Sequence, residues 1–356
     1  MCKCEDFIYF GSYNYKDGIR SGSIYYCNTN DLIELFALND NCENKVSSIL
    51  RTKERDNKNH IINLNSESAN LPTALSAKKQ ICMNNGDRLK TKALLCKITE
   101  TTGTFKVIEH EGKVFVAGCH EILIIKERTL VKRVCTEFLN TSISAHGNRI
   151  IVGHDNGKIT LTDLNFNNFQ SFEFCNHLVW SVYIYENRIY CGCDCGRFNV
   201  FEFKIENRHN FYELNENEKQ LSVSFINNYI AAEGIDLIKM NNIYSQKRAS
   251  GITSIIHHKN NIYVSGYDKR IIIYDINNLS CKNELELDSG IWDILIYEDL
   301  ILAACTYDGF KVLNHTKNIL YENKNVELIY TMLKHGNIII YIDFYGKSIF
   351  IDELKE

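Results

Sequence analysis

The chain has 356 residues, of which 45% are hydrophobic and 24% charged, and its formal net charge is -4 at pH 7. This composition is typical of a soluble globular protein with a sizeable core, and its slight negative charge provides no basic surface for binding nucleic acid. No apolar run approaches the roughly 18 residues of a membrane helix, and the first residues lack the features of a secretory signal. We therefore expect a cytoplasmic protein whose 14 cysteines are reduced.

Short aromatic and β-branched runs separated by Gly, Asn and Asp predict three N-terminal strands, at residues 7–13, 22–27 and 32–36. Residues 39–97 are instead rich in Asn, Lys, Ser and Glu and show no sustained periodicity. Such a segment buries too little apolar surface to offset the entropy that it loses on ordering. We predict one domain formed by residues 1–38 and 98–356, interrupted by a mobile insertion at 39–97.

A unit of about 38 residues is repeated along the rest of the chain. Each copy has an apolar run, a short polar turn and a second apolar run that ends in small residues. A Gly or Asp turn and a third run usually follow, as at 158–163 and 270–275. The first two runs and their turn occur at residues 104–118, 141–153, 180–192, 221–232, 252–266, 289–305 and 328–341.

The length of this unit matches a four-stranded propeller blade, and the pairs Thr162-Asp163 and Tyr274-Asp275 stand where WD-repeat proteins carry Trp-Asp. We predict an all-β WD-repeat β-propeller with seven blades, eight being the alternative. In a closed ring the N-terminal strands would complete the last blade, which removes exposed sheet edges. The unit at 219–247 is the weakest contributor to the count. A helical solenoid is disfavoured because no 3.6-residue period is sustained.

The common nucleotide-binding, serine hydrolase and metalloprotease motifs are absent from the sequence, so a catalytic site would have to be assembled from loops of several blades. Cys191, Cys193 and Cys195 alternate along one predicted strand and so share a face. Zinc sites space their thiolates by two or more residues and need a second pair of ligands. We therefore predict that these cysteines pack in the core, a role supported by Cys119 and Cys305 at the repeat position of Cys193, and we expect no metal and no cofactor.

Acidic and aromatic residues gather near the predicted strand ends. Asp194, Asp268 and Asp308 lie at or beside the turn between the second and third strands, where an Asp normally accepts hydrogen bonds from the turn backbone. The alternative is that one or two of them line a pocket and act as a general base. Aromatic residues at such positions usually pack between blades, but several that converge on the axis would form a cage for a quaternary ammonium ligand. These aromatic residues are Tyr13, Trp180, Tyr267, Trp292, Tyr307 and Tyr345.

One block of the chain resembles a known family. Gly290–Ile294 followed by Leu302–Asn314 is similar to the signature G-[VI]-W-x-I and A-A-C-x-x-x-G-F-K-[IV]-L-N of the WD-repeat diphthine methyl ester hydrolases of the diphthamide biosynthesis pathway. Weaker similarity extends over most of the remaining chain. Around Asp194 the sequence resembles the family's S-G-G-D-D-G unit, from which Cys193 and Cys195 depart.

This resemblance implies a hydrolase that removes a methyl ester from the modified histidine of translation elongation factor 2, a protein modification reaction. The substrate carries a trimethylammonium group, which gives the aromatic cage a ligand. By position, the catalytic candidates are Asp194, Asp268, Cys305 and Asp308. The substrate-binding candidates are Trp180, Tyr267, Trp292 and Tyr307. The alternative is a non-catalytic WD-repeat scaffold for protein–protein interaction, because this fold by itself does not establish a function.

Overall fold

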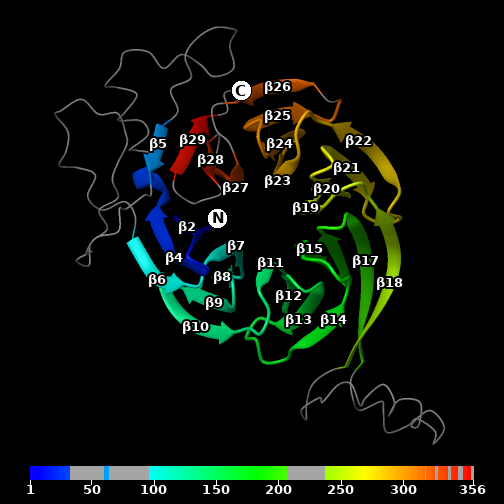
Figure 1. Cartoon of the computed structure of the whole chain (residues 1–356), viewed down its shortest axis with the longest axis horizontal. Coiled ribbons are helices and arrows are strands. Elements are labelled where there is room, and N and C mark those ends of the chain that lie inside the picture. Colours follow the sequence, from blue (N-terminus) through cyan, green and yellow to red (C-terminus); the bar gives the residue numbers. More distant parts are fainter. Residues whose placement is uncertain are drawn as a thin grey trace, which may run out of the picture.

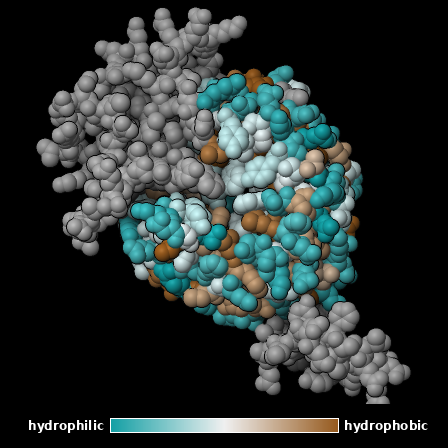
Figure 2. All heavy atoms as spheres, in the orientation of Figure 1, coloured by the Kyte–Doolittle hydropathy of each residue, from teal (hydrophilic) through white to brown (hydrophobic). Residues whose placement is uncertain are grey.

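The computed structural model describes residues 1–32, 60–63, 96–206, 237–316, 318–324, 328–335, 338–343 and 348–353. Over these residues the chain forms seven antiparallel sheets arranged as blades around a central axis (Figure 1). The predicted all-β propeller is therefore confirmed. On the face seen in Figure 2, hydrophilic side chains dominate the outer surface of the blades, and hydrophobic ones form separate patches.

Five blades follow one another along the chain, each built as a four-stranded meander. Blade 2 comprises β7 (Thr104–His110), β8 (Lys113–Gly118), β9 (Glu121–Lys126) and β10 (Thr129–Cys135). Blade 3 comprises β11 (Asn140–His146), β12 (Arg149–His154), β13 (Lys158–Asp163) and β14 (Gln170–Glu173). Blade 4 comprises β15 (Val179–Tyr185), β16 (Arg188–Cys193), β17 (Arg197–Glu206) and β18 (Leu237–Lys247).

The next two blades have the same order of strands. Blade 5 comprises β19 (Ile252–His258), β20 (Asn261–Gly266), β21 (Arg270–Asp275) and β22 (Cys281–Glu286). Blade 6 comprises β23 (Ile291–Tyr297), β24 (Leu300–Cys305), β25 (Phe310–Asn314) and β26 (Ile319–Asn323).

The ring closes differently from our expectation. The N-terminal strands form a blade of their own, blade 1, with β1 (Cys2–Cys4), β2 (Phe7–Gly11), β4 (Ile19–Asn28) and β6 (Cys96–Thr101), and β3 (Asn14–Lys16) also pairs with β4. Blade 7 comprises β27 (Ile329–His335), β28 (Ile338–Asp343), β29 (Ser348–Glu353) and, at its outer edge, β5 (His60–Asn63). The prediction that the N-terminal strands complete the last blade is thus wrong.

The strand β5 ties the first and last blades together. It comes from the predicted insertion, between β4 and β6 of blade 1, yet it pairs with β29 of blade 7. The chain therefore leaves blade 1, completes blade 7 and returns to blade 1. The remaining residues of the insertion as far as 95 lie outside the described ranges.

The weak repeat unit at 219–247 does not add a blade among the described residues. Its last part belongs to β18, which pairs with β17 over the whole length from Arg197 to Glu206 and forms the outer strand of blade 4. The strand pair predicted at 221–232 falls outside the residues that the structure describes.

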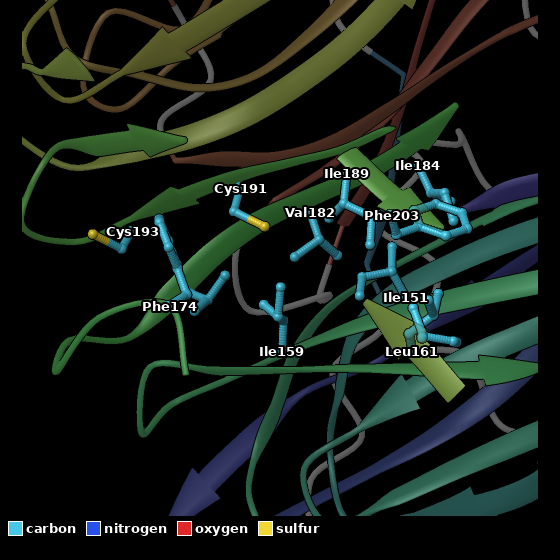
Figure 3. Close-up of a cluster of buried hydrophobic side chains, with 12 residues drawn as sticks. Ile151, Ile159, Leu161, Phe174, Val182, Ile184, Ile189, Cys191, Cys193 and Phe203 are labelled. Atoms are coloured by element: carbon cyan, nitrogen blue, oxygen red, sulfur yellow. The ribbon is translucent and has the colours of Figure 1, made fainter. Parts of the chain in front are cut away.

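Apolar side chains between neighbouring blades form the core. Figure 3 shows one such cluster, in which Ile151 and Leu161 of blade 3 meet Val182 and Ile189 of blade 4. All four side chains are buried, and each contributes about 1.5–3 kcal/mol through removal of its apolar surface from water. Alternating β-branched residues therefore both form the strands and attach each blade to the next.

A β-bulge lies at the start of the innermost strand in blades 2 to 7. In each of these strands one residue is skipped by the pairing register with the second strand. A bulge leaves its extra residue unpaired and redirects its side chain. The skipped residues are Phe105, Thr141, Trp180, Thr253, Trp292 and Tyr330. Four of these six residues are aromatic, and three of the four, Trp180, Trp292 and Tyr330, lie at the candidate site, where Trp292 contacts the other two.

An ion pair joins blades 4 and 5. Arg248, directly after β18, donates from Nε to Asp268 Oδ2 at 2.7 Å and from Nη1 to the carbonyl of Val264 at 3.0 Å. The side chains of Arg248 and Asp268 are only 3% and 7% exposed. The pair is therefore shielded from water and contributes more strongly than a surface pair when one partner is removed.

We predict that Arg248→Met lowers the free energy of unfolding by about 3–5 kcal/mol, because it leaves the Asp268 carboxylate buried without its cation. Urea denaturation followed by circular dichroism measures this loss. The matched control is Arg270→Met, which removes a 2.9 Å pair with Glu284 whose side chains are 47% and 43% exposed, and we expect a loss of about 0–1 kcal/mol. Equal losses for the two variants would contradict this interpretation.

Candidate functional site

Aromatic side chains from blades 4 to 7 meet at one place. The ring of Trp292 lies 5.3 Å from Trp180, 5.7 Å from Tyr267 and 5.5 Å from Tyr330, measured between ring centroids. Trp180 and Trp292 come from blades that are separated by blade 5, so they approach each other on the axis side of the ring. We call Trp180, Tyr267, Trp292 and Tyr330 the aromatic cluster.

Hydrogen bonds fix the outer members of the aromatic cluster. Trp180 Nε1 donates to Asp194 Oδ1 at 2.9 Å, and the hydroxyl of Tyr330 donates to the carbonyl of Phe105 in blade 2 at 2.6 Å. Burial raises the pKa of Tyr330 well above its ordinary value, and the pKa of Tyr267 is raised by burial and by the nearby Asp194 carboxylate. Both phenols therefore stay protonated and uncharged over the physiological pH range.

A cavity of about 690 Å³ opens beside the aromatic cluster. Its lining comes from the β20–β21 turn, the segment before β23, the turn after β24 and the start of β27. These residues are Tyr267, Lys269, Asp288, Ser289, Gly290, Trp292, Thr306, Tyr307, Asp308, Leu328 and Ile329. Tyr307 is 74% exposed at the edge of the cavity, and the hydroxyls of Ser289 and Thr306 lie 3.0 Å apart in its wall. The cavity thus combines aromatic surface with hydroxyl and carboxylate groups.

A buried lysine organises the acidic side of the cavity. Lys311 on β25 has a fully buried side chain, and its Nζ lies 2.8 Å from Glu322, 3.4 Å from Asp308 and 3.6 Å from Asp288. Burial opposes the charge of Lys311, but its hydrogen bond and ionic contact with Glu322, supported by Asp308, raise its pKa overall. One ammonium thus faces three carboxylates, and two of these, Asp288 and Asp308, line the cavity.

The structure places the four predicted catalytic candidates in four different settings. Asp308 lines the cavity, whereas Asp194 holds the Trp180 indole and Asp268 is paired with Arg248. Cys305 ends β24 and is fully buried, and burial raises the pKa of its thiol to about 12. Of these four residues, Asp308 is the one that borders the cavity.

The predicted binding residues lie together. Trp180, Tyr267 and Trp292 belong to the aromatic cluster, and Tyr307 lines the adjoining cavity. Tyr13 packs on Phe105, with 5.4 Å between their ring centroids, and Tyr345 lies outside the described residues.

Sequence reasoning missed Tyr330 and the acidic group around Lys311. Tyr330 occupies the same place in its repeat as Trp180 and Trp292, directly after the first residue of the innermost strand. An alignment of the repeats with one another would therefore have identified it as a candidate. The role of Lys311 had a weaker signal, because a lysine within an otherwise apolar strand predicts only that charged partners lie nearby.

Comparisons with known proteins agree with this architecture. No protein-family model matches the chain. A segment is 29% identical over 104 residues to "Diphthine methyltransferase" of Mus musculus, and the match covers 27% of this chain and 21% of the mouse protein. The matched region therefore spans about a fifth of that relative.

Solved structures similar to the chain support the fold alone. A computationally designed protein, Ika8, superimposes with a TM-score of 0.52 at 13% identity and covers 73% of this chain and 74% of its own. A chain of the mitotic checkpoint complex gives a TM-score of 0.57 at 8% identity, covering 74% and 78%. The fold is that of WD40-type β-propellers. The functional clue that these comparisons add is the distant sequence similarity to a protein whose name refers to diphthine. Within the described residues, the structure contains no helix that is long and apolar enough to span a membrane.

We predict that the thiol of Cys305 resists alkylation in the folded protein. Its pKa of about 12 leaves almost no thiolate at pH 8, and the side chain is buried. Iodoacetamide labelling followed by peptide mass spectrometry is expected to modify Cys305 at least about tenfold more slowly than the exposed Cys281. Unfolding in urea should abolish the difference. Rapid labelling of Cys305 in the folded state would restore it as a candidate nucleophile.

Proposed function

We propose that the protein is a diphthine methyl ester hydrolase that acts on the modified histidine of translation elongation factor 2. The observation that carries this proposal is the convergence of the aromatic cluster, formed by residues from four blades, on a cavity that also contains carboxylates and hydroxyls. The name of the mouse relative, which couples diphthine with a methyl group, supports the same substrate.

The aromatic cluster suits the trimethylammonium group of this substrate. A quaternary ammonium cannot donate hydrogen bonds, so it is recognised by the negative faces of aromatic rings, which contribute about 0.5–2 kcal/mol each. Asp288 and Asp308 place two carboxylates in the cavity wall, where Lys269 also lies, and Glu322 contacts both Lys311 and Lys324. Because these charges largely offset one another, recognition of the trimethylammonium group in this proposal depends on the aromatic rings.

The chemical step needs a base for water and donors for the ester oxygen. In our proposal Asp308 accepts a proton from a water molecule, and the oxygen of this water attacks the ester carbonyl carbon. The hydroxyls of Ser289 and Thr306 stabilise the oxyanion that forms. The bond to the methoxy group then breaks, and methanol leaves with the proton returned by Asp308, so that a free acid remains on the modified histidine. Lys311 positions Asp308 through the contact of its Nζ with Asp308 Oδ2 and does not touch the substrate.

The printed name of the mouse relative denotes methyl transfer, whereas we propose hydrolysis. Hydrolysis uses water as the acceptor and requires no methyl donor, and the residues of the Gly290–Asn314 block are those that resemble the hydrolase family. An assay in buffer without any methyl donor separates the two reactions.

The direct test incubates the purified protein with elongation factor 2 that carries methylated diphthine. Mass spectrometry of the modified peptide is expected to show the loss of one CH₂ unit, together with release of methanol. An unchanged mass under conditions in which the protein is folded and binds elongation factor 2 would reject the hydrolase.

Two substitutions are predicted to separate binding from chemistry. Trp292→Ala removes the central ring of the aromatic cluster and should raise KM about tenfold to thirtyfold, with a smaller effect on kcat. Asp308→Asn should lower kcat by about 10²–10⁴ with little change in KM, because it removes the base. The control Lys282→Ala lies on the outer strand β22 and should leave both constants unchanged. An unaltered kcat in Asp308→Asn would remove Asp308 from the mechanism.

The alternative is a scaffold that binds a protein partner without chemistry. It is favoured by the state of the other candidates, because Asp194 and Asp268 are held in structural contacts and Cys305 is protonated and buried. A pull-down that recovers a stable multiprotein complex lacking elongation factor 2, from a protein that leaves the methylated peptide unchanged, would support this function.

A further inference from the structure

We propose that Cys175, Cys193 and Cys195 form a binding site for one thiophilic divalent metal ion of the zinc type. The three sulfur atoms lie within 4.8 Å of one another, and the Sγ atoms of Cys193 and Cys195 are 2.8 Å apart. This site is separate from the cavity of the proposed hydrolase and does not depend on that function.

The three thiols are presented by ordered backbone. Cys193 is the last residue of β16, and Cys195 lies in the turn that follows, where the N–H of Gly196 donates to the carbonyl of Cys193 at 2.9 Å. Cys175 comes from the adjacent blade 3, and its backbone N–H donates to the carbonyl of Gly157 at 3.2 Å. The site therefore bridges blades 3 and 4 and does not depend on a mobile loop.

The spacing of the sulfur atoms suits a tetrahedral metal ion. Zn–S bonds of about 2.3 Å place the thiolates of such a site about 3.8 Å apart. The Sγ atoms of Cys193 and Cys195 would have to separate by about 1 Å to reach that value, and the distances from Cys175 Sγ to the other two sulfur atoms are at most 4.8 Å, about 1 Å above it. On binding, each thiol releases its proton to solvent and its sulfur donates an electron pair to the metal, so no oxidant or reductant is involved.

A second cavity provides room for a fourth ligand. This cavity has a volume of about 310 Å³ and is lined by Cys175, Cys195, His177, Arg197 and Lys247 among others. The imidazole of His177 or a water molecule would complete the tetrahedron. Three thiolates around one Zn²⁺ leave a net charge of -1, which the side chains of Arg197 and Lys247 offset.

Core packing accounts for only part of this arrangement. Cys191 and Cys193 are buried within the apolar cluster between blades 3 and 4 (Figure 3), as the sequence predicts. Cys175 and Cys195, by contrast, are only partly buried and open onto the second cavity. The sequence argument against a metal site considered Cys191 as the third ligand, whereas the structure replaces it by Cys175.

The site has a connection to the aromatic cluster. Asp194 lies between Cys193 and Cys195 in the chain, and its carboxylate accepts the hydrogen bond from Trp180 Nε1. A metal ion that holds both neighbouring sulfur atoms would fix this turn and therefore the Trp180 indole. The chain contains only two tryptophans, Trp180 and Trp292, so their fluorescence reports on this effect.

The test titrates the full-length, reduced protein with Co²⁺ alone and then displaces it with Zn²⁺. We expect one tightly bound Co²⁺ per chain, with the intense sulfur-to-metal charge-transfer absorption and the visible bands of tetrahedral thiolate coordination. Replacement by Zn²⁺ should remove the colour, and the tryptophan fluorescence should change on addition of either metal.

Three variants locate the site. Cys175→Ser and Cys195→Ser should each weaken binding at least about 100-fold, since removal of a direct ligand exceeds the 10- to 100-fold cost of altering an outer contact. Cys281→Ser, which removes an exposed thiol on blade 5, is the control and should bind as the unchanged protein does. Both ligand variants remove partly buried thiols, and circular dichroism tests whether they are folded.

Two results would overturn the proposal. One is binding that is equally strong in Cys175→Ser and Cys281→Ser, which would assign the metal to other groups. The other is the absence of Co²⁺ binding by the fully reduced protein, whether or not mass spectrometry of the untreated protein finds a disulfide between two of the three cysteines.

Discussion

The β-bulge at the start of the innermost strand in blades 2 to 7 is the constraint on which the site depends. An innermost strand with regular pairing would direct alternate side chains into the two neighbouring interfaces between blades. The bulge releases one residue from this alternation, and in blades 4, 6 and 7 that residue is Trp180, Trp292 or Tyr330. Aromatic rings that are far apart in the chain can therefore meet.

In two other blades the bulge carries a threonine that attaches one blade to the next. In blades 3 and 5 the skipped residues are Thr141 and Thr253, whose hydroxyls donate to carbonyls of the following blade, Val179 and Ile291. A short β-branched hydroxyl residue reaches only the neighbouring backbone, whereas an indole or phenol reaches past it. The β-bulge thus supports either attachment between blades or the aromatic cluster, depending on which side chain it carries.

Much of this architecture could be predicted from the sequence because it repeats. Short apolar runs separated by Gly, Asn and Asp turns specify strands locally, and their recurrence predicts the blades. The closure by β5 could not be predicted, because four residues, His60–Asn63, within a polar segment give no periodic signal and pair with a strand nearly 300 positions away. The approach of Cys175 to Cys195 is also a contact between blades, which spacing along the chain does not contain.

The sequence predicted the aromatic part of the candidate site better than its acidic part. Aromatic residues at equivalent repeat positions could be expected to converge, since a ring brings equivalent positions to one axis, and Trp180 and Trp292 do meet. The acidic residues occupy equivalent turns too, yet they have different partners: Asp194 binds an indole, Asp268 binds Arg248 and Asp308 contacts Lys311. Position in the repeat fixes where a side chain lies, but its neighbours in the adjoining blade fix its chemistry.

In the proposed hydrolase, recognition and chemistry would depend on different parts of the site. Three members of the aromatic cluster come from innermost strands, and Tyr267 comes from the β20–β21 turn, so the packing of the blades places the cluster whether or not a reaction takes place there. The carboxylate of Asp308 lies on a turn and is placed by Lys311, a lysine that is stable in a buried position only while acidic partners surround it. In our proposal, recognition depends on the arrangement of the blades, whereas hydrolysis depends on the carboxylate of Asp308. In our proposal, a related propeller that lacked Lys311 would keep the aromatic cluster and lose the contact that places its base, so residue 311 is a position at which a hydrolase and a scaffold of the same shape are expected to differ.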